Sequence, residues 1–243
     1  MKIIAMIPAR YAATRFPYKL MQPLGDKTVI LTTYQNTVAT QLFSEVYVVT
    51  DHLIIYNEIT QHGGKAILSK AEHQSGSDRI AEAIQNMDVD IVVNVQGDEP
   101  FVDFTMLQNL IRVFYKDANV KVASPIKIIT DSAKINNPNI VKVAIDLQYN
   151  SLLFSRSVIP YVVAQNYTAT YYEHVGVYAF TKAALLQFTQ WPISPLEAAE
   201  KIECLRYLQN GVQLRMVLTN ADIIKIDVPD DLPLAEAYLN KIK

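Results

Sequence analysis

The sequence is poor in cysteine, since Cys204 is the single cysteine among 243 residues. One thiol cannot close a disulfide within the chain, and it cannot supply a cysteine-rich zinc site. A chain without such cross-links is typical of a reducing compartment. The sequence therefore predicts a cytoplasmic protein.

Long hydrophobic runs are also missing. No stretch approaches the roughly 18 apolar residues that a membrane-spanning helix needs, so we expect no membrane insertion. The apolar run near the N-terminus reaches Pro8 after five residues and then meets Arg10, whereas the apolar core of a signal peptide needs about 7–15. This segment instead predicts a buried first strand.

Neither sign of charge is in large excess. The chain has 22 Lys and Arg against 24 Asp and Glu, which gives a formal net charge of −2. That balance offers no whole-chain attraction for nucleic acid or for an anionic membrane, so we expect no nucleic-acid partner. A hydrophobic fraction of 50% with 19% charged residues is typical of a globular protein.

The first half alternates apolar, β-branched runs with helical patterns. Strands are expected at 2–7, 45–50, 65–68 and 91–95, and helices at 29–42, 52–61, 77–87 and 104–115. This alternation predicts an α/β fold, with a mostly parallel sheet and helices on both faces.

The second half is less regular. Extended segments are expected at 120–127, 141–146, 152–155, 176–180, 214–218 and 224–226, with helices from 194 to about 210 and from 229 to 243. No linker or repeat interrupts the chain. We therefore expect a single domain over 1–243, whose second half inserts an antiparallel element.

Ligands of parallel sheets bind beyond the carboxyl ends of the strands. The loop after the first strand carries three cations, Arg10, Arg15 and Lys19. Cations so close together suit a triphosphate, whose own charges repel one another. A solvated loop with its cations in water is the alternative.

Two aspartates follow later strands. Asp98 stands at the end of the strand at 91–95, where a carboxylate can hold Mg²⁺ bound to phosphate oxygens, or where it can simply cap a turn. Asp227 precedes the last helix, as an N-cap or as a second metal ligand opposite Asp98. The residues alone leave both questions open.

Two further segments are ambiguous. Ser75 lies three residues before Asp78, which is typical of a helix cap, although free amides at a helix start can also bind a polar ligand. His174 and Tyr178 share one face of an expected strand, with Gly176 leaving space between them. A lone histidine in a strand is more often structural than functional.

Eight motifs together resemble the 3-deoxy-manno-octulosonate (Kdo) cytidylyltransferase family, the CMP-Kdo synthetases of Gram-negative bacteria. They are I-P-A-R-Y-A-x-T-R-x-P-x-K at 7–19, T-D at 50–51, H-Q-S-G at 73–76, N-V-Q-G-D-E-P at 94–100, F-S-R at 154–156, H-x-G-x-Y at 174–178, P-L-E at 195–197 and E-x-L-R at 203–206. The first and fourth motifs are specific in combination, and the match runs from Met1 to the last helix.

The resemblance implies a nucleotide-diphospho-sugar transferase-like fold, Mg²⁺ as cofactor and a homodimer. It implies transfer of CMP from CTP to the anomeric hydroxyl of Kdo, with release of pyrophosphate, for lipopolysaccharide biosynthesis. The residues that it assigns to the nucleotide are Ala9, Arg10, Arg15, Lys19, Ser75, Gly76 and Arg79. It assigns Mg²⁺ to Asp98 and Asp227, and the sugar acid to Gln96, Arg156, His174, Tyr178 and Glu203. Catalysis would fall to Arg10, Lys19, Asp98 and Asp227.

The chain departs from the family pattern at several positions. Tyr18 stands where the family usually has glycine, the segment 161–163 lacks the usual basic residues, and Cys204 replaces a usual glutamine. Val228 replaces a threonine. These departures leave room for another 3-deoxy-2-keto sugar acid, of the 8-amino-Kdo or sialate type, or for a catalytically silent nucleotide-binding homologue.

Overall fold

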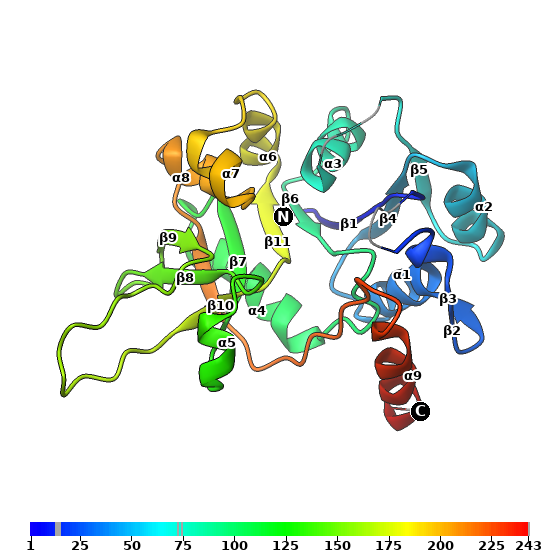
Figure 1. Ribbon diagram of the computed structural model, residues 1–243. Coiled ribbons are helices and arrows are strands. Elements are labelled where there is room, and N and C mark those ends of the chain that lie inside the picture. Colours follow the sequence, from blue (N-terminus) through cyan, green and yellow to red (C-terminus); the bar gives the residue numbers. More distant parts are fainter. Residues whose placement is uncertain (13–15, 72, 74, 243) are drawn as a thin grey trace. The chain divides into compact units, whose positions relative to one another are not determined.

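The structure, a computed structural model, describes all residues except 13–15, 72, 74 and 243 (Figure 1). The chain forms two compact units. The first contains Met1–Leu107 and Asp222–Lys243, and the second contains Gln108–Ala221. The chain therefore leaves the first unit, builds the second and returns. That the whole chain acts as one domain stays a prediction.

A parallel sheet forms the centre of the first unit. Strand β1 (Ile3–Ala9) lies between β4 (Glu45–Thr50) and β6 (Ile91–Asn94), and β5 (Ala66–Leu68) pairs with the outer side of β4. All of these pairings are parallel. Almost every residue of β1 is buried, because a parallel sheet covered on both faces exposes neither side of its central strands.

Helices cover this sheet from two sides. Helices α1 (Val29–Ala39) and α2 (Leu53–Gln61) connect β1, β4 and β5 in one direction, and α3 (Gly76–Ile84) then leads back to β6 (Figure 1). Because such crossovers are right-handed, the reversal places α3 on the opposite face. The carboxyl ends of β1 and β6 meet where the direction reverses, which is where α/β sheets bind ligands.

Shorter elements complete the first unit. A 3₁₀ turn (η1, Lys19–Met21) and a small hairpin of β2 (Pro23–Leu24) and β3 (Lys27–Thr28) connect β1 to α1. Helix α9 (Asp231–Ile242) ends the chain. Helix α4 (Phe104–Lys116) runs across the boundary into the second unit.

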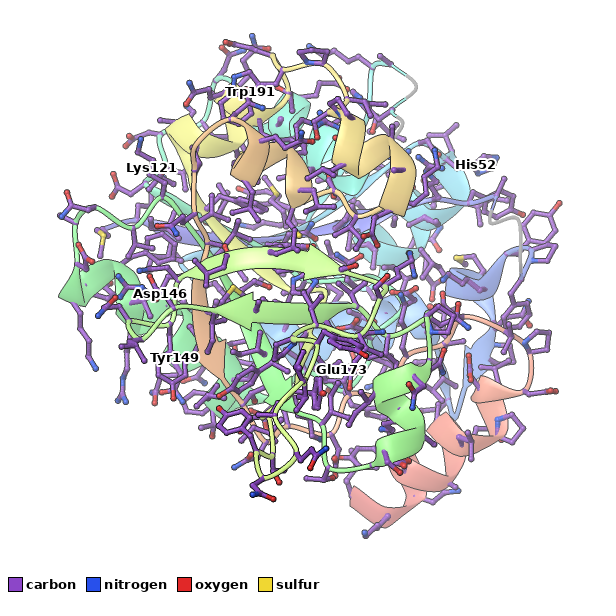
Figure 2. The ribbon with its side chains drawn as sticks, turned by 60° about the vertical axis from the view of Figure 1, so that its left-hand side comes forward. His52, Lys121, Asp146, Tyr149, Glu173 and Trp191 are labelled. Carbon is purple, nitrogen blue, oxygen red and sulfur yellow. The ribbon has the colours of Figure 1, made fainter. Side chains whose placement is uncertain are left out.

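The second unit is largely antiparallel, as the sequence predicts. Strand β7 (Val122–Ile128) pairs antiparallel with β10 (Tyr172–His174) and β11 (Tyr178–Thr181), and parallel with β12 (Arg215–Leu218). Strand β10 also pairs with β8 (Lys142–Ile145), which forms a hairpin with β9 (Ser151–Ser155). Asp146 and Tyr149, labelled in Figure 2, lie in the turn of this hairpin. The Asp146 carboxylate accepts hydrogen bonds from the main-chain amides of Gln148 and Asn150.

Four short helices belong to the second unit. They are α5 (Ser132–Asn136), α6 (Lys182–Phe188), α7 (Pro195–Glu200) and α8 (Leu205–Gln209). Tyr207 of α8 stacks on Phe180 and Phe188, with ring centroids 6.1 and 4.7 Å away. This aromatic contact packs α8 and α6 against β11.

Two sequence-based predictions are wrong. The single helix expected from 194 to 210 is two helices, because Lys201 adopts left-handed backbone angles (φ 55°) and ends α7. The strand expected at 224–226 does not form. Instead the Ile226 amide donates one hydrogen bond to the Asp98 carbonyl (2.9 Å), and no ladder follows. A single tertiary contact replaces the expected pairing.

Among the described helices, none is long and apolar enough to cross a bilayer.

Candidate active site

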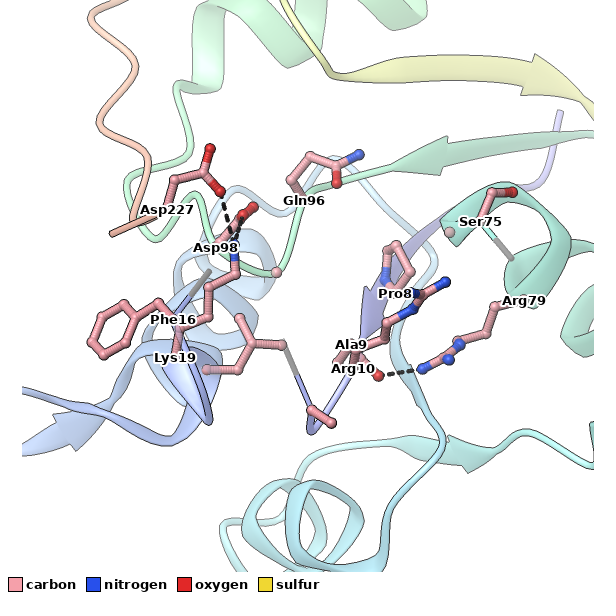
Figure 3. A pocket seen from close by; sticks show the side chains of 14 residues that line it. Pro8, Ala9, Arg10, Phe16, Lys19, Ser75, Arg79, Gln96, Asp98 and Asp227 are labelled. Atoms are coloured by element: carbon pink, nitrogen blue, oxygen red, sulfur yellow. Dashed lines mark hydrogen bonds and ion pairs between the residues drawn. The ribbon is translucent and has the colours of Figure 1, made fainter. Parts of the chain in front are cut away.

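A cavity of about 380 Å³ opens at the carboxyl ends of β1 and β6, within the first unit (Figure 3). Its lining comes from four segments: the end of β1 and its loop, the start of α3, the turn after β6, and the returning C-terminal segment. The lining residues are Pro8, Ala9, Arg10, Ala12, Phe16, Lys19, Leu20, Ser75, Gly76, Arg79, Gln96, Gly97, Asp98 and Asp227.

Two carboxylates and one ammonium converge at one end of this cavity. Lys19 Nζ lies 2.5 Å from Asp98 Oδ2 and 2.9 Å from Asp227 Oδ1 (Figure 3). The hydrogen bond from the Ile226 amide to the Asp98 carbonyl holds the C-terminal segment beside the turn after β6. The fold thus brings together three residues that are far apart in the sequence.

The contacts of Asp227 lie in the charged cluster. Its carboxylate contacts lysines and does not cap α9. Asp231, the first residue of α9, holds this segment from the helix, since its carboxylate accepts hydrogen bonds from the amides of Asp227 (2.7 Å) and Val228 (2.9 Å). The Asp227 side chain is therefore left pointing into the charged cluster.

Glu99 and Lys225 extend this cluster, and the sequence-based prediction missed both. Burial, followed by the negative charge of Asp98, raises the pKa of Glu99 to about 7. Lys225 Nζ lies 3.3 Å from Asp227 Oδ2. Burial acts to lower the pKa of Lys225, but the negative charges of Asp98 and Asp227 outweigh it and raise that pKa. Adjacency to the two aspartates was the available sequence signal.

The start of α3 lies against the end of β1. Ser75 Oγ accepts a hydrogen bond from the Asp78 amide (3.1 Å) and donates one to the Asp78 carboxylate (2.9 Å), so this serine does cap the helix. A Cβ on Gly76 would lie 3.0 Å from Pro8 Cγ, and one on Gly97 would lie 3.1 Å from the Pro8 carbonyl oxygen. Both glycines permit the backbone to approach β1 closely.

The cations of the β1 loop are placed differently from one another. Arg10 Nη2 donates to the His73 carbonyl (2.7 Å), so its guanidinium lies beside the segment that leads into α3. Arg79 is nearly fully buried, and it donates to the Ala9 carbonyl and to Asp51 Oδ2 (3.0 Å). Arg15, which was predicted to bind the triphosphate, lies outside the described residues.

Arg79 helps to fix the backbone at the carboxyl end of β1. Burial acts to raise the pKa of Asp51, but the hydrogen bonds from Arg79 and from the Tyr11 amide, together with the Arg79 charge, lower that pKa overall. Because the guanidinium also binds the Ala9 carbonyl, it ties the end of β1 to the residue that follows β4. Arg79 lines the cavity with a charge that is already paired.

Tyr18 stands where the family usually has glycine, and its backbone conformation is one that favours glycine. It has a φ of 59°, the left-handed conformation that glycine adopts without cost. Its ring lies 4.6 Å from that of Tyr11, which in turn stacks on His52 at 4.0 Å. We infer that these ring contacts offset part of the backbone strain.

The residues predicted for the sugar acid divide between the units. Gln96 lines the cavity of the first unit, where its amide donates to Asn94 Oδ1 (3.3 Å). Arg156, His174, Tyr178 and Glu203 belong to the second unit.

His174 and Tyr178 lie together in the second unit. The His174 ring contacts Tyr178 edge-on, with centroids 5.3 Å apart, and its Nε2 lies 2.8 Å from Ser124 Oγ. Burial lowers the pKa of His174 to about 4, so its imidazole is neutral at physiological pH. Burial first, and then the charges or dipoles of Cys204 and Glu203, raise the pKa of Tyr178 well above its usual value. The two rings and Glu203 therefore lie in one neighbourhood.

Comparison with known proteins agrees with this architecture. The model of a family described as cytidylyltransferase matches residues 4–222. A 3-deoxy-manno-octulosonate cytidylyltransferase of Flavobacterium johnsoniae is 55% identical, over the whole of both chains. One of Christiangramia forsetii is 52% identical, over 98% of this chain and 97% of its own.

Solved structures give the same result. A CMP:2-keto-3-deoxy-manno-octonic acid synthetase complexed with CTP superimposes with a TM-score of 0.94 at 32% identity, over the whole of both chains. A 4-diphosphocytidyl-2C-methyl-D-erythritol synthase of Anaerococcus prevotii, 16% identical with a TM-score of 0.63 over 98% of each chain, shares the fold alone. The chain belongs to the cytidylyltransferase family and, within it, to the 3-deoxy-manno-octulosonate cytidylyltransferases.

Proposed function

We propose that this protein transfers CMP from CTP to the anomeric hydroxyl of Kdo and releases pyrophosphate. The observation that carries the proposal is the convergence of Lys19, Asp98 and Asp227 at the exits of β1 and β6. Full-length similarity to Kdo cytidylyltransferases supports the choice of both substrates.

The cavity of the first unit is the nucleotide site in this proposal. Arg10 and Lys19 flank it and supply positive charge for the triphosphate. The capped start of α3, with Ser75 and Gly76, presents main-chain amides at its rim. Arg15 and Ala9 remain predicted nucleotide contacts.

Asp98 and Asp227 have the chemistry that Mg²⁺ requires. Their oxygens lie 2.5 and 2.9 Å from one ammonium, so both already accommodate a cation between them. Among the described residues, no group of three or more His, Cys, Asp or Glu is placed to hold a metal. Mg²⁺ commonly binds through one or two carboxylates and completes its shell with phosphate oxygens and water, which this pair permits.

The reaction is an in-line displacement at the α-phosphorus. A bond forms between the anomeric oxygen and the α-phosphorus, the bond to the β-phosphate oxygen breaks, pyrophosphate leaves, and the hydroxyl proton passes to solvent. Lys19 and Arg10 stabilise the negative charge that gathers on the α-phosphate and on the leaving group. When bound, Mg²⁺ neutralises phosphate charge and acidifies the attacking hydroxyl.

The family resemblance assigns the acceptor to Gln96, Arg156, His174, Tyr178 and Glu203. We propose that Gln96 places the sugar beside the α-phosphate, and that the Arg156 guanidinium binds its carboxylate, because the two groups match through paired hydrogen bonds. His174, Tyr178 and Glu203 would contact the hydroxyls. The chain departs from the family pattern at 161–163 and at Cys204, which the family places near the acceptor. The alternative acceptor is therefore 8-amino-Kdo or a sialate-type acid.

We propose a cytoplasmic homodimer that supplies an activated sugar for lipopolysaccharide biosynthesis. Exposed side chains of Leu152, Tyr161, Val163 and Tyr167 are available in the second unit for contact with a second copy. Sedimentation equilibrium at micromolar concentration tests this, since a monomer would contradict it.

A pyrophosphate-release assay tests the function directly. Purified protein is incubated with Mg²⁺, a panel of nucleoside triphosphates, and Kdo, 8-amino-Kdo or sialate as acceptor. We expect release with CTP and Kdo. Calorimetric binding of CTP without release for any acceptor would instead identify a silent homologue.

A further inference from the structure

Lys142 on β8 is fully buried, although its side chain ends in an ammonium group. Its ammonium donates to three main-chain carbonyls, those of Asn137 (3.0 Å), Ile140 (2.8 Å) and Arg156 (2.5 Å). Burial, together with the positive charge of Arg156, lowers the pKa of Lys142. Burying an ammonium group costs free energy, whereas burying an apolar side chain does not. The role of Lys142 is therefore sought in the three carbonyl groups that it binds.

Arg156 follows β9 and is fixed on several sides. Its guanidinium donates through Nε to the Glu200 carbonyl (2.7 Å) and through Nη1 to the Pro138 carbonyl (2.9 Å). Its main-chain amide donates to Glu200 Oε2 (2.7 Å). Both guanidinium partners are neutral carbonyls, and no carboxylate of the described second unit forms an ion pair with Arg156.

Lys142 holds both sides of the contact between Arg156 and Pro138. Pro138 lies in the turn between Asn137 and Ile140, and the Lys142 ammonium binds the carbonyls of both of these residues. The same ammonium binds the carbonyl of Arg156 itself. A single charged group therefore sets the position of the guanidinium and of the carbonyl that orients it.

The side chains around Arg156 carry more positive than negative charge, which favours binding of an anion. The Glu200 carboxylate is occupied by the Ser155 hydroxyl (2.7 Å) and by the Arg156 amide. Two cations, Lys142 and Arg156, therefore face one carboxylate. A guanidinium that is oriented by neutral carbonyls keeps its charge for a ligand, and it binds a carboxylate best when its planar fork is fixed in advance.

We propose that Lys142 is a positioning residue that fixes Arg156 to receive the carboxylate of the acceptor sugar acid, with Glu200 assisting from α7. This rests on the proposed function, in which Arg156 contacts that carboxylate. Lys142 itself touches no substrate and acts through the Arg156 backbone and the turn that contains Pro138.

The test replaces the ammonium with an apolar side chain of similar length, as Lys142→Met. We expect the KM for Kdo to rise about tenfold or more, because charge-assisted hydrogen bonds weaken when the guanidinium moves. The KM for CTP should change by less than about twofold, since the nucleotide cavity lies in the first unit. Steady-state kinetics with each substrate varied in turn measures both.

A double-mutant cycle separates positioning from general stability. In an Arg156→Ala background, Lys142→Met should change the KM for Kdo by less than about twofold, because its effect passes through Arg156. Equal effects in both backgrounds would overturn the proposal. So would a rise in both KM values that parallels a loss of thermal stability.

Two further variants complete the experiment. Lys127→Met is the matched control, since Lys127 also donates to a main-chain carbonyl of the second unit, that of Ala221 (3.0 Å), and should leave the KM for Kdo unchanged. If Lys142→Met does not fold, Glu200→Gln carries the test, and an unchanged KM for Kdo would then overturn the proposal. An unchanged KM in Arg156→Ala alone would contradict the proposed role of Arg156, and no turnover by the parent enzyme would contradict the proposed function.

Discussion

Lys19 lies between Asp98 and Asp227, although the sequence-based prediction assigned it to the triphosphate. The two assignments are compatible if the ammonium moves from the carboxylates to the phosphates as substrate binds. Without a cation between them, two carboxylates this close would repel each other. Lys19 therefore keeps the pair assembled while the cavity is empty of nucleotide.

This position predicts competition between Lys19 and a divalent cation. Lys19→Met should tighten binding of Mn²⁺, used as a probe for Mg²⁺, by about tenfold in the absence of CTP, because a positive charge leaves the site. Electron paramagnetic resonance of free Mn²⁺ measures the affinity without turnover. Lys65→Met, which removes a surface lysine paired with Glu45, is the control. Unchanged or weaker binding in Lys19→Met would show that the ammonium does not compete.

Asp98 is predicted to be needed for fast turnover. Asp98→Ala should lower kcat by at least about 10²-fold, since removing an electrostatic stabiliser of this kind costs some 3 kcal/mol of activation free energy. Pyrophosphate release at saturating CTP and Kdo measures this. Asp146→Ala, in the hairpin turn of the second unit, serves as a control for acidic residues outside the site. A near-normal rate in Asp98→Ala would remove Asp98 from the mechanism.

The neutral His174 predicts a pH dependence of stability. Its pKa is about 4 in the folded protein and near 6.5 when unfolded. The unfolded chain therefore binds more protons between these values, so the free energy of unfolding falls as pH falls from about 7 to 4. Because His174 keeps some exposure, we expect a loss of about 2 kcal/mol.

Urea unfolding of the parent and of His174→Asn across this pH range isolates the contribution. The difference in unfolding free energy between the two proteins should shrink as pH falls. Acidic residues contribute equally to both proteins and cancel in that difference. A constant difference from pH 7 to pH 4 would show that His174 already carries its proton in the fold.

The elements of the first unit could largely be predicted from the sequence. Strand β4 has the predicted bounds, and α2 begins one residue later than expected because His52 caps it. These segments follow local rules, namely apolar periodicity and side chains that cap helices. The same rules place Asp98 and the β1 loop at neighbouring strand ends.

The features that the sequence did not predict depend on contacts between residues that are far apart in the chain. At the break, Lys201 adopts a left-handed conformation, and Glu200 just before it accepts hydrogen bonds from Arg156 through its carbonyl and its carboxylate. The segment around Ile226 stays irregular because its amide binds the turn after β6. Lys142 was missed because nothing local distinguishes a buried lysine from a surface one. Such contacts join residues from distant parts of the chain, and no local pattern encodes them.

The end of helix α7 is a position where one substitution should stabilise the protein. Lys201 is exposed, has left-handed backbone angles and ends the helix, where glycine is the favoured residue. Lys201→Gly should therefore stabilise the protein by about 0.5–1 kcal/mol, as measured by chemical denaturation. Lys134→Gly inside α5 should instead destabilise it by a similar amount. Destabilisation by Lys201→Gly would show that its side chain contributes to the cap.

For the whole molecule, the location of the cavity predicts how CTP stabilises the chain. At about 100 times its Kd, a ligand adds about 2.7 kcal/mol to the state that binds it. Hydrogen exchange with CTP and Mg²⁺ should therefore slow most in the first unit, at the exits of β1 and β6, the start of α3 and the segment around Asp227. UTP serves as the control for the nucleobase. Protection confined to the second unit would contradict the assigned nucleotide site.

The return of the chain to the first unit has a consequence for biosynthesis. The parallel sheet of the first unit is complete once β6 has been made, but Asp227 and Ile226, whose amide binds the Asp98 carbonyl, are translated only after the whole second unit. A nascent chain that has emerged only to Ala221 therefore contains the first carboxylate without the second. Translation must pass through the whole second unit before the charged cluster can assemble, so a product truncated at Ala221 would carry the parallel sheet without Asp227.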